Sequence, residues 1–191
     1  LRMVCSMHHR NSSSVSPFQA NTGIPDAAIA AAQPATCLSR LLPPPPVGQT
    51  VIVGAGKAAA AMAKAVEQNY SAHVTGLVTT QHGYQLATDR IVVVEAAHPI
   101  PDRKGVEASR RILELVSNLE AGDLVLCLLS GGGSALMCLP APGITLEDKQ
   151  SLTHALLIAG APISDINCVR RHLSSIKGGR LALAAQPARV V

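Results

Sequence analysis

A run of hydrophobic residues at positions 124–129 is the strongest pattern in the chain, and it leads directly into a serine, three glycines and a second serine. A run of this length is too short to cross a membrane and is typical of a β-strand buried on both faces. The pattern therefore predicts a central strand followed by a glycine-rich turn.

Shorter apolar segments predict further strands at residues 50–53, 74–79, 91–95 and, at the end of the chain, 188–191. Between these strands, the spacing of hydrophobic residues or the residues typical of helix ends predict helices over residues 57–69, 103–119, 146–160, 164–177 and 180–185. This alternation predicts an α/β fold with a doubly wound, mainly parallel sheet and helices on both faces, similar to a Rossmann fold. The last segment is only the opening of a strand, so we expect a fold that is incomplete at its C-terminus.

Capping side chains mark where three of these helices begin. Asp102 is expected to cap the helix over 103–119, and Ser164 is expected to cap the helix over 164–177. Thr145 and Asp148 form a capping box for the helix over 146–160, which Gly160 ends. The inner face of the helix over 103–119 is expected to consist of Ile112, Leu113, Leu115, Val116 and Leu119.

Residues 1–25 differ from the rest of the chain, because they are rich in Ser, Asn and His and contain no acidic residue. We expect a disordered or spurious leader here, although such a start also faintly resembles an organellar transit peptide. Residues 27–42 predict a helix interrupted near Pro34, and the four prolines at 43–46 predict an extended polyproline II segment.

Composition narrows the range of functions. Hydrophobic residues make up 48% of the 191 positions but aromatic residues only 2%, so the chain lacks platforms for stacking nucleobases. The net charge of +4 is concentrated after residue 164, which favours a small anionic ligand over nucleic acid, with a solvated basic face as an equal alternative. Five scattered cysteines form neither a zinc motif nor a disulfide framework and are typical of a cytoplasmic protein.

Gly54, Gly56 and Lys57 follow the first strand and open the next helix in the loose pattern G-x-G-x-x-[GA]. Glycines at such a turn let the backbone approach a phosphate, and Lys57 adds positive charge. The second strand ends without the acid that a nicotinamide ribose needs, and the spacing is not that of a Walker A loop. An ordinary exposed lysine remains the alternative for Lys57.

The turn after the central strand is the stronger candidate site and consists of Ser130, Gly131, Gly132, Gly133 and Ser134. Three consecutive glycines lose much backbone entropy on folding, which an anion bound to backbone N–H groups would explain. The serines do not match a hydrolase nucleophile elbow and are interpreted as hydroxyl donors. The alternative is a tight strand-to-helix turn without a ligand.

Two further segments carry candidate side chains. His98, in a loop with two prolines, could orient a substrate hydroxyl or take its proton, or could be ordinary polar surface. The second segment has polar residues at spacings of three, four and three, which predict one helix face: Asn167, Arg170, Ser174 and Lys177. Arg170 could bind a carboxylate through two parallel hydrogen bonds, while a solvent-facing stripe is the alternative.

Taken together, these segments closely resemble the amino-terminal domain of class II glycerate 2-kinases, whose members are often labelled hydroxypyruvate reductase. The resemblance extends over about residues 27–191 and rests on five segments in order: GAGKAAAAMA (54–63), HPIPD (98–102), SGGGSAL (130–136), LEDKQ (146–150) and NCVRRHLSSIKGG (167–179). The combination is specific, although none of the five would suffice alone.

The resemblance implies ATP-dependent phosphorylation of D-glycerate to 2-phosphoglycerate, assisted by Mg²⁺. It implies that Lys57 and Arg170 are catalytic, with Lys57 on the transferring phosphate, and that the turn at 130–134 binds phosphate or carboxylate. Further binding residues would be Gly54, Gly56, His98, Asn167 and Lys177. The implied partner is a small molecule, with no nucleic acid and no membrane, and the full-length protein could form a homodimer.

We expect residues 26–191 to be a partial amino-terminal domain, without the carboxy-terminal domain and inactive or nearly so on its own. Metal ligands are not identified, since Glu95 and Asp102 are the only acids near the glycine-rich turns. Two other functions stay open: an NAD(P)H-dependent hydroxypyruvate reductase, and a non-catalytic anion-binding fragment.

Overall fold

The structure is a computed structural model that describes residues 23–191, and the chain divides into two units after residue 33. The described element of the first unit is helix α1 (Gly23–Ala31). It begins before residue 27, where the sequence predicted a helix. The predicted leader at 1–25 otherwise lies outside the described residues.

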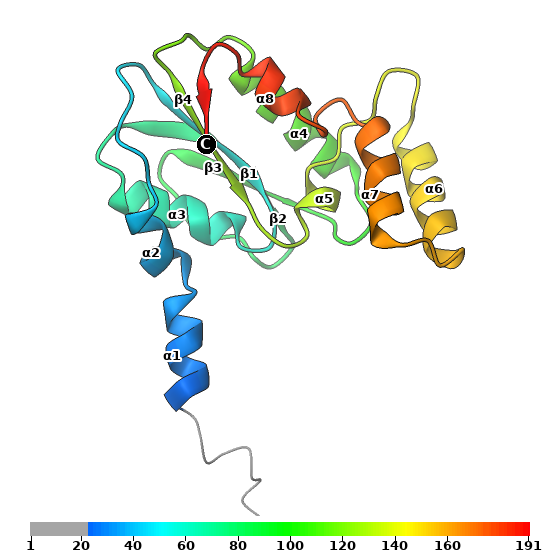
Figure 1. The fold of residues 1–191 in the computed structure, drawn as a ribbon, viewed down its shortest axis with the longest axis horizontal. Coiled ribbons are helices and arrows are strands. Elements are labelled where there is room, and N and C mark those ends of the chain that lie inside the picture. Colours follow the sequence, from blue (N-terminus) through cyan, green and yellow to red (C-terminus); the bar gives the residue numbers. More distant parts are fainter. Residues whose placement is uncertain (1–22) are drawn as a thin grey trace, which may run out of the picture. The chain divides into compact units, whose positions relative to one another are not determined.

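A five-stranded, wholly parallel sheet forms the centre of the second unit, with the strand order β3-β2-β1-β4-β5 (Figure 1). Its strands are β1 (Thr50–Ala55), β2 (Val74–Gln81), β3 (Ile91–Ala96), β4 (Leu124–Leu129) and β5 (Arg189–Val190). The predicted strands are all present. β1 and β4, in the middle of the sheet, are paired along their whole lengths.

Helices cover both faces of the sheet, because successive side chains of a strand point to opposite sides. Ile52 of β1 packs in one core with α3 (Ala59–Asn69), where small residues such as Ala63 are fully buried. Its neighbours Val51 and Val53 pack in a second core with α4 (Arg103–Val116) and α8 (Arg180–Ala184). The doubly wound α/β prediction is confirmed.

The helices that follow β4 are α5 (Gly133–Leu136), α6 (Leu146–Ile158), α7 (Ile163–His172) and α8. The predicted capping box is present, since the Thr145 hydroxyl accepts from the Asp148 N–H and the Asp148 carboxylate accepts from the Thr145 N–H. Gly160, with φ of +66°, follows the end of α6, as predicted.

The prediction for α7 was wrong at both ends. Pro162, not Ser164, is its N-cap residue, and the helix stops at His172 instead of continuing to residue 177. Tertiary contacts end it: the Leu173 carbonyl accepts a hydrogen bond from Lys149 Nζ, and Ser174 forms an antiparallel bridge with Pro140. These contacts replace the next helical turn.

Two smaller differences concern α4 and the segment after Gln33. Asp102 caps α4 as predicted, with its Oδ1 accepting from the Gly105 N–H at 2.8 Å. On the expected inner face, Leu115 is 39% exposed, whereas Ile112 and Val116 are buried. The interrupted helix continues as α2 (Pro34–Cys37) and the 3₁₀ helix η2 (Leu38–Arg40).

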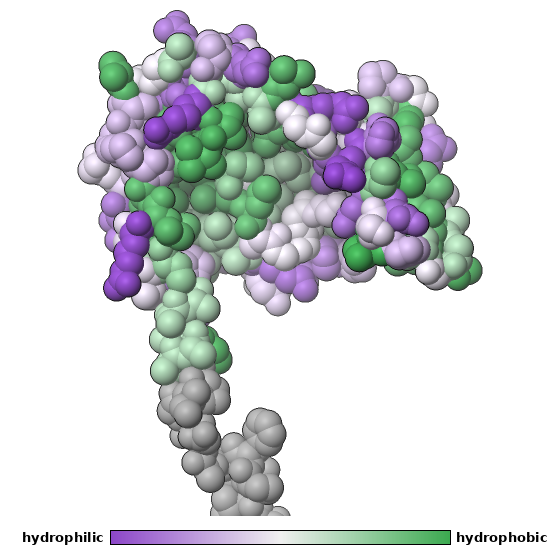
Figure 2. Space-filling view, in the orientation of Figure 1, coloured by the Kyte–Doolittle hydropathy of each residue, from purple (hydrophilic) through white to green (hydrophobic). Residues whose placement is uncertain are grey.

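Hydrophobic side chains gather over β4 and β5, between α3 and α8 (Figure 2). Large exposed hydrophobic residues on or beside these elements are Leu129, Leu183 and Val191. In the described part of the chain, no helix combines the length and apolar character needed to cross a bilayer.

Candidate functional site

The carboxyl ends of β1 and β4 lie side by side at the point where the strand order reverses (Figure 1). After β1 the chain passes to the face covered by α3, whereas α8 and α4 cover the other face. Open α/β sheets bind ligands at such a switch point, in the space beyond the strand ends. The glycine-rich turns after these two strands meet there.

Hydrogen bonds join the two turns into one unit. The Lys57 N–H donates to the Gly131 carbonyl at 2.8 Å, and the Ser130 N–H donates to the Ala55 carbonyl at 3.1 Å. The Ser130 hydroxyl accepts from the Ala58 N–H at 3.0 Å, at the start of α3. Each turn is thus held in place by the other.

Several of the glycines are required by close packing of the backbone. A Cβ atom on Gly54 would lie 2.2 Å from the Leu128 carbonyl oxygen, and one on Gly133 would lie 2.7 Å from the Ala55 carbonyl oxygen. Gly56 is equally crowded by the second turn. A ligand is therefore not needed to explain these three glycines.

Gly131 and Gly132 are different. A Cβ atom on Gly131 would have no heavy atom within 4 Å, so the space beside it is open. The N–H groups of Gly131 and Gly132 donate to no residue in the described part of the chain. Gly132 has φ of +87°, which favours glycine. Two adjacent unpaired N–H groups form a cradle suited to an anion.

Lys57 and His98 lie beside this cradle. A Cβ atom on Gly132 would be 3.1 Å from His98 Nε2 and 3.5 Å from Lys57 Cγ. Among the described residues, the Lys57 ammonium has neither a hydrogen-bond nor an ion-pair partner, and the side chain is exposed. A free ammonium and an imidazole beside free N–H groups suit a phosphate or carboxylate ligand.

The acids near the site do not offer a magnesium centre. Glu95 accepts from the Gly83 N–H at 2.7 Å, and Asp102 is occupied as the cap of α4. Their other carboxylate oxygens each lie 4.0 Å from a ring nitrogen of His82, that of Glu95 from Nδ1 and that of Asp102 from Nε2. Over residues 23–191 no group of three or more His, Cys, Asp or Glu side chains is arranged to hold a metal ion.

A second polar group lies next to α5 and contains three cations, Lys149, Arg170 and Lys177. Lys177 Nζ donates to the Met137 carbonyl and Lys149 Nζ to the Leu173 carbonyl, each at 2.6 Å. Burial lowers the pKa of Lys149 and brings the pKa of Lys177 down to about 8. We call these three residues the cationic cluster.

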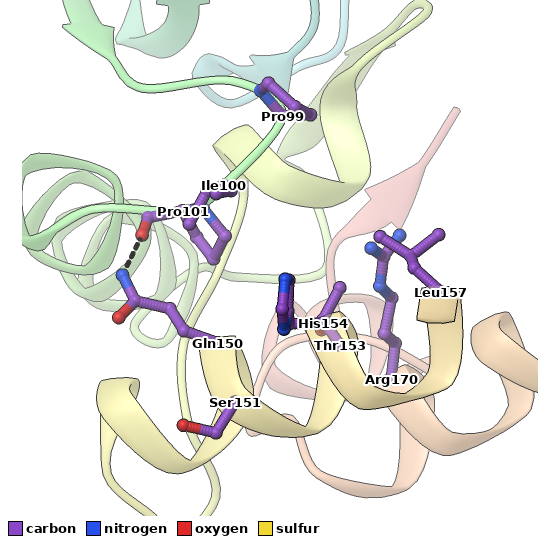
Figure 3. Close-up of a pocket in the computed structure, with 9 residues that line it drawn as sticks. All are labelled: Pro99, Ile100, Pro101, Gln150, Ser151, Thr153, His154, Leu157 and Arg170. Atoms are coloured by element: carbon purple, nitrogen blue, oxygen red, sulfur yellow. Dashed lines mark hydrogen bonds between the residues drawn. The ribbon is translucent and has the colours of Figure 1, made fainter. Parts of the chain in front are cut away.

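A larger and a smaller cavity adjoin each other beside the cationic cluster. The larger, about 390 Å³, lies between the loop of His98 and the helices α6 and α7 (Figure 3), and is lined by Pro99, Ile100, Pro101, Gln150, Ser151, Thr153, His154, Leu157 and Arg170. The smaller, about 20 Å³, shares Pro101, Thr153 and Arg170 with it and adds Ser134, Ala135, Cys138, Lys149 and Lys177. Gln150 Nε2 donates to the Pro101 carbonyl at 2.7 Å across the larger cavity, as the dashed line in Figure 3 marks.

The structure thus sorts the predicted site residues into two groups. The first, at the switch point, contains Gly54, Gly56, Lys57, His98, Ser130, Gly131, Gly132 and Gly133. The second, around the smaller cavity, contains Ser134, Arg170 and Lys177.

The remaining candidate, Asn167, is exposed, makes no hydrogen bond with a described residue and lines neither of these two cavities. The single helix face predicted for Asn167 to Lys177 was wrong, because α7 ends before Ser174. Lys149 was missed. It lies within the LEDKQ segment, and nothing in the spacing distinguishes it from a solvent-facing lysine.

Several known proteins are similar to this chain in sequence or in fold. Residues 21–191 match a family model described as "Domain of unknown function (DUF4147)". A protein of Agrobacterium vitis named "Putative hydroxypyruvate reductase" is 46% identical over 178 residues, which are 93% of this chain and 41% of that protein. The D-glycerate 2-kinase of Thermotoga maritima is 44% identical over 165 residues, 85% of this chain and 40% of that enzyme.

A crystal structure titled as the glycerate kinase of Thermotoga maritima is similar to this chain with a TM-score of 0.79 and 42% identity. The similarity covers 86% of this chain and 40% of that structure. The chain therefore spans about two fifths of the length of the relatives it matches.

Proposed function

Because the chain belongs to the family described as DUF4147, we propose that it supplies part of a glycerate kinase that uses ATP to phosphorylate the 2-hydroxyl of D-glycerate. Residues 26–191 would form the amino-terminal α/β domain of that enzyme. The relatives named as glycerate kinases support this proposal, as does the crystal structure of one of them. Under this proposal the enzyme is cytoplasmic and acts on a small molecule, and formation of a homodimer stays a prediction.

The observation that carries the proposal is the cradle at the switch point. Phosphoryl transfer depends mainly on positioning the phosphate and neutralising its charge. The unpaired N–H groups of Gly131 and Gly132 and the free ammonium of Lys57 provide both. Lys57 would contact the transferring phosphate, and His98 would lie close enough to orient the acceptor hydroxyl.

Bound Mg²⁺ would neutralise phosphate charge in such a reaction. One oxygen of Glu95 and one of Asp102 accept from backbone N–H groups, and over residues 23–191 no three His, Cys, Asp or Glu side chains cluster, so the described residues do not form a magnesium centre by themselves. No role in the reaction is therefore assigned to a metal bound by this chain.

A hydroxypyruvate reductase is the second candidate, favoured by the name of the Agrobacterium vitis relatives. The end of β2 argues against it, because a nicotinamide ribose is usually bound by an acid at this position. Here β2 ends with Thr80 and Gln81, neither of which is an acid, and the Thr80 hydroxyl donates to the Gly56 carbonyl at 3.2 Å. A non-catalytic anion-binding fragment is the third candidate, and it differs from the kinase only in forming no product.

A hybrid enzyme tests the proposal. This chain would replace the matching region of the Thermotoga maritima D-glycerate 2-kinase, with which it is 44% identical. We expect the hybrid to form 2-phosphoglycerate from ATP and D-glycerate, and the 191-residue chain alone to form little or none. A folded hybrid without kinase activity contradicts the proposal. Oxidation of NADH or NADPH with hydroxypyruvate by the same hybrid supports the reductase instead.

A further inference from the structure

The cationic cluster has no carboxylate partner among the described residues, and the titratable group that faces it is the thiol of Cys138, whose pKa is raised by burial. The ion pairs in the described part of the chain involve His82 and Arg110, and none reaches Lys149, Arg170 or Lys177. Lys149 is only 7% exposed, and like charges raise the free energy of such a group further. Three cations held together without an acid indicate a binding site for an anion.

The existing hydrogen bonds leave donors available. An ammonium has three donors, and one donor of Lys149 and one of Lys177 are accounted for by the Leu173 and Met137 carbonyls. These bonds fix the two side chains to the ends of α7 and α5. The Arg170 guanidinium makes no hydrogen bond with a described residue, so the N–H donors along its edge are free for a ligand.

The size of the smaller cavity favours a carboxylate over a phosphate. A volume of about 20 Å³ holds about one water-sized atom, which matches a single carboxylate oxygen. The remainder of a small acid could lie in the adjoining 390 Å³ cavity, which Arg170, Pro101 and Thr153 also line (Figure 3).

We propose that Lys149, Arg170 and Lys177 bind the carboxylate of a small organic acid, which leaves the phosphate groups to the glycine cradle beside Lys57. This inference rests on the proposed function, in which the acid is D-glycerate. It assigns Lys149 to the site and separates the carboxylate position at the smaller cavity from the phosphate position at Gly131 and Gly132. The proposed site draws on α5, α6 and α7, because all three contribute side chains to the smaller cavity.

The lysine resonances of the 191-residue chain provide a direct test. The chain has five lysines, so ¹³Cε signals can be assigned with Lys149→Arg and Lys177→Arg variants. We expect millimolar D-glycerate to raise the pKa of Lys177 above about 8. The signal of exposed Lys104 serves as the internal reference. A lysine that only holds a backbone carbonyl would titrate identically with and without D-glycerate. That outcome, or a larger effect of inorganic phosphate than of D-glycerate, overturns the proposal.

Affinity measurements separate the two positions. Arg170→Gln should weaken D-glycerate binding by about tenfold or more and change ATP binding less than about twofold. The matched control is Arg171→Gln, at the neighbouring exposed position of α7. Equal loss of both ligands, or no loss of D-glycerate binding, contradicts the proposal. If the Arg170→Gln variant does not fold, the effect of D-glycerate on the titration of Lys177 in the wild-type chain tests the proposal.

The two proposals can fail separately. If D-glycerate shifts the lysine titration but the hybrid enzyme makes no 2-phosphoglycerate, the proposed kinase function is wrong and the carboxylate site stands. If the hybrid is active and its Arg170→Gln variant keeps an unchanged KM for D-glycerate, the carboxylate site is wrong and the kinase function stands.

Discussion

The backbone N–H of Lys57 donates a 2.8 Å hydrogen bond to the carbonyl of Gly131, and this bond joins two turns that are more than seventy residues apart in the chain. The bond brings the Lys57 side chain to the edge of the cradle formed by Gly131 and Gly132. It uses the carbonyl of the turn and leaves the two N–H groups free. The main chain therefore holds the ammonium-bearing residue and the cradle in a fixed relation, which substitutions at either turn can probe.

Lys57→Met in the hybrid enzyme should lower kcat by about 100-fold or more, because one charged group on the transferring phosphate is lost. The protein should remain folded, since the exposed ammonium has no partner in the described structure. Rates of 2-phosphoglycerate formation and thermal unfolding measure the two effects. Lys64→Met, within α3, serves as the control and should keep near-normal activity. An active Lys57→Met enzyme would remove this lysine from the site.

Two neighbouring glycines should respond differently to alanine. Gly133→Ala should destabilise the fold by about 1–3 kcal/mol, because the new methyl group meets the Ala55 carbonyl at 2.7 Å. Gly131→Ala adds its methyl group to open space and should change stability by less than about 0.5 kcal/mol. Urea unfolding measures both. ATP binding should weaken with Gly131→Ala, since the methyl group enters the space proposed for phosphate, and unchanged binding would exclude that position.

Ser130→Ala should destabilise the protein by about 1 kcal/mol, because the Ala58 N–H at the start of α3 loses its acceptor. Urea unfolding at neutral pH provides the measurement. The control is Ser134→Ala, which removes an exposed hydroxyl without a described hydrogen bond. Equal stability of the two variants would show that the Ser130 hydroxyl does not support the turn.

The lowered pKa of Lys177 should appear in the pH dependence of the free energy of unfolding. Burial lowers its pKa from 10.5 to about 8, so between these pH values the unfolded chain carries a proton that the folded chain has lost. The free energy of unfolding should therefore rise with pH across this window, by at most about 3 kcal/mol, with no contribution to the slope below about pH 8. Urea unfolding of the wild type and Lys177→Met at several pH values isolates this rise. Parallel curves would mean that Lys177 titrates normally, and Lys104→Met is the matched control.

The sheet could be predicted because its signals are local. The apolar run at 124–129 and the shorter runs before it are typical of strands that are buried between two layers of helices, and they form such strands here. The caps at Asp102 and Thr145 are also local, since each side chain bonds to an N–H three residues away. Both kinds of feature depend on residues that are close together in the sequence, so the sequence alone predicts them.

The end of α7 could not be predicted, because the reason lies far away in the sequence. No glycine or proline stands between His172 and Lys177, so local preference continues the helix. The Lys149 ammonium and the Pro140 backbone, more than twenty residues earlier, take the groups that the next turn would use. The same distance hides Lys149 from sequence reasoning, since its burial depends on α7 and the turn at Ser174.

The glycines show a third kind of limit. Their number at 131–133 predicted a bound anion, but only the first two leave N–H groups free, while Gly133 is fixed by the neighbouring strand end. Sequence alone does not distinguish a glycine that admits a ligand from one that admits another part of the backbone.

The bonds between Ala55, Lys57, Ala58 and the second turn are made by peptide groups and one hydroxyl, none of which ionises near neutrality. Mildly acidic pH or added salt therefore changes the electric field around the cradle without altering its shape. An enzyme built on this frame would lose phosphate affinity in concentrated electrolyte and regain it fully on dilution, with no refolding step between the two states.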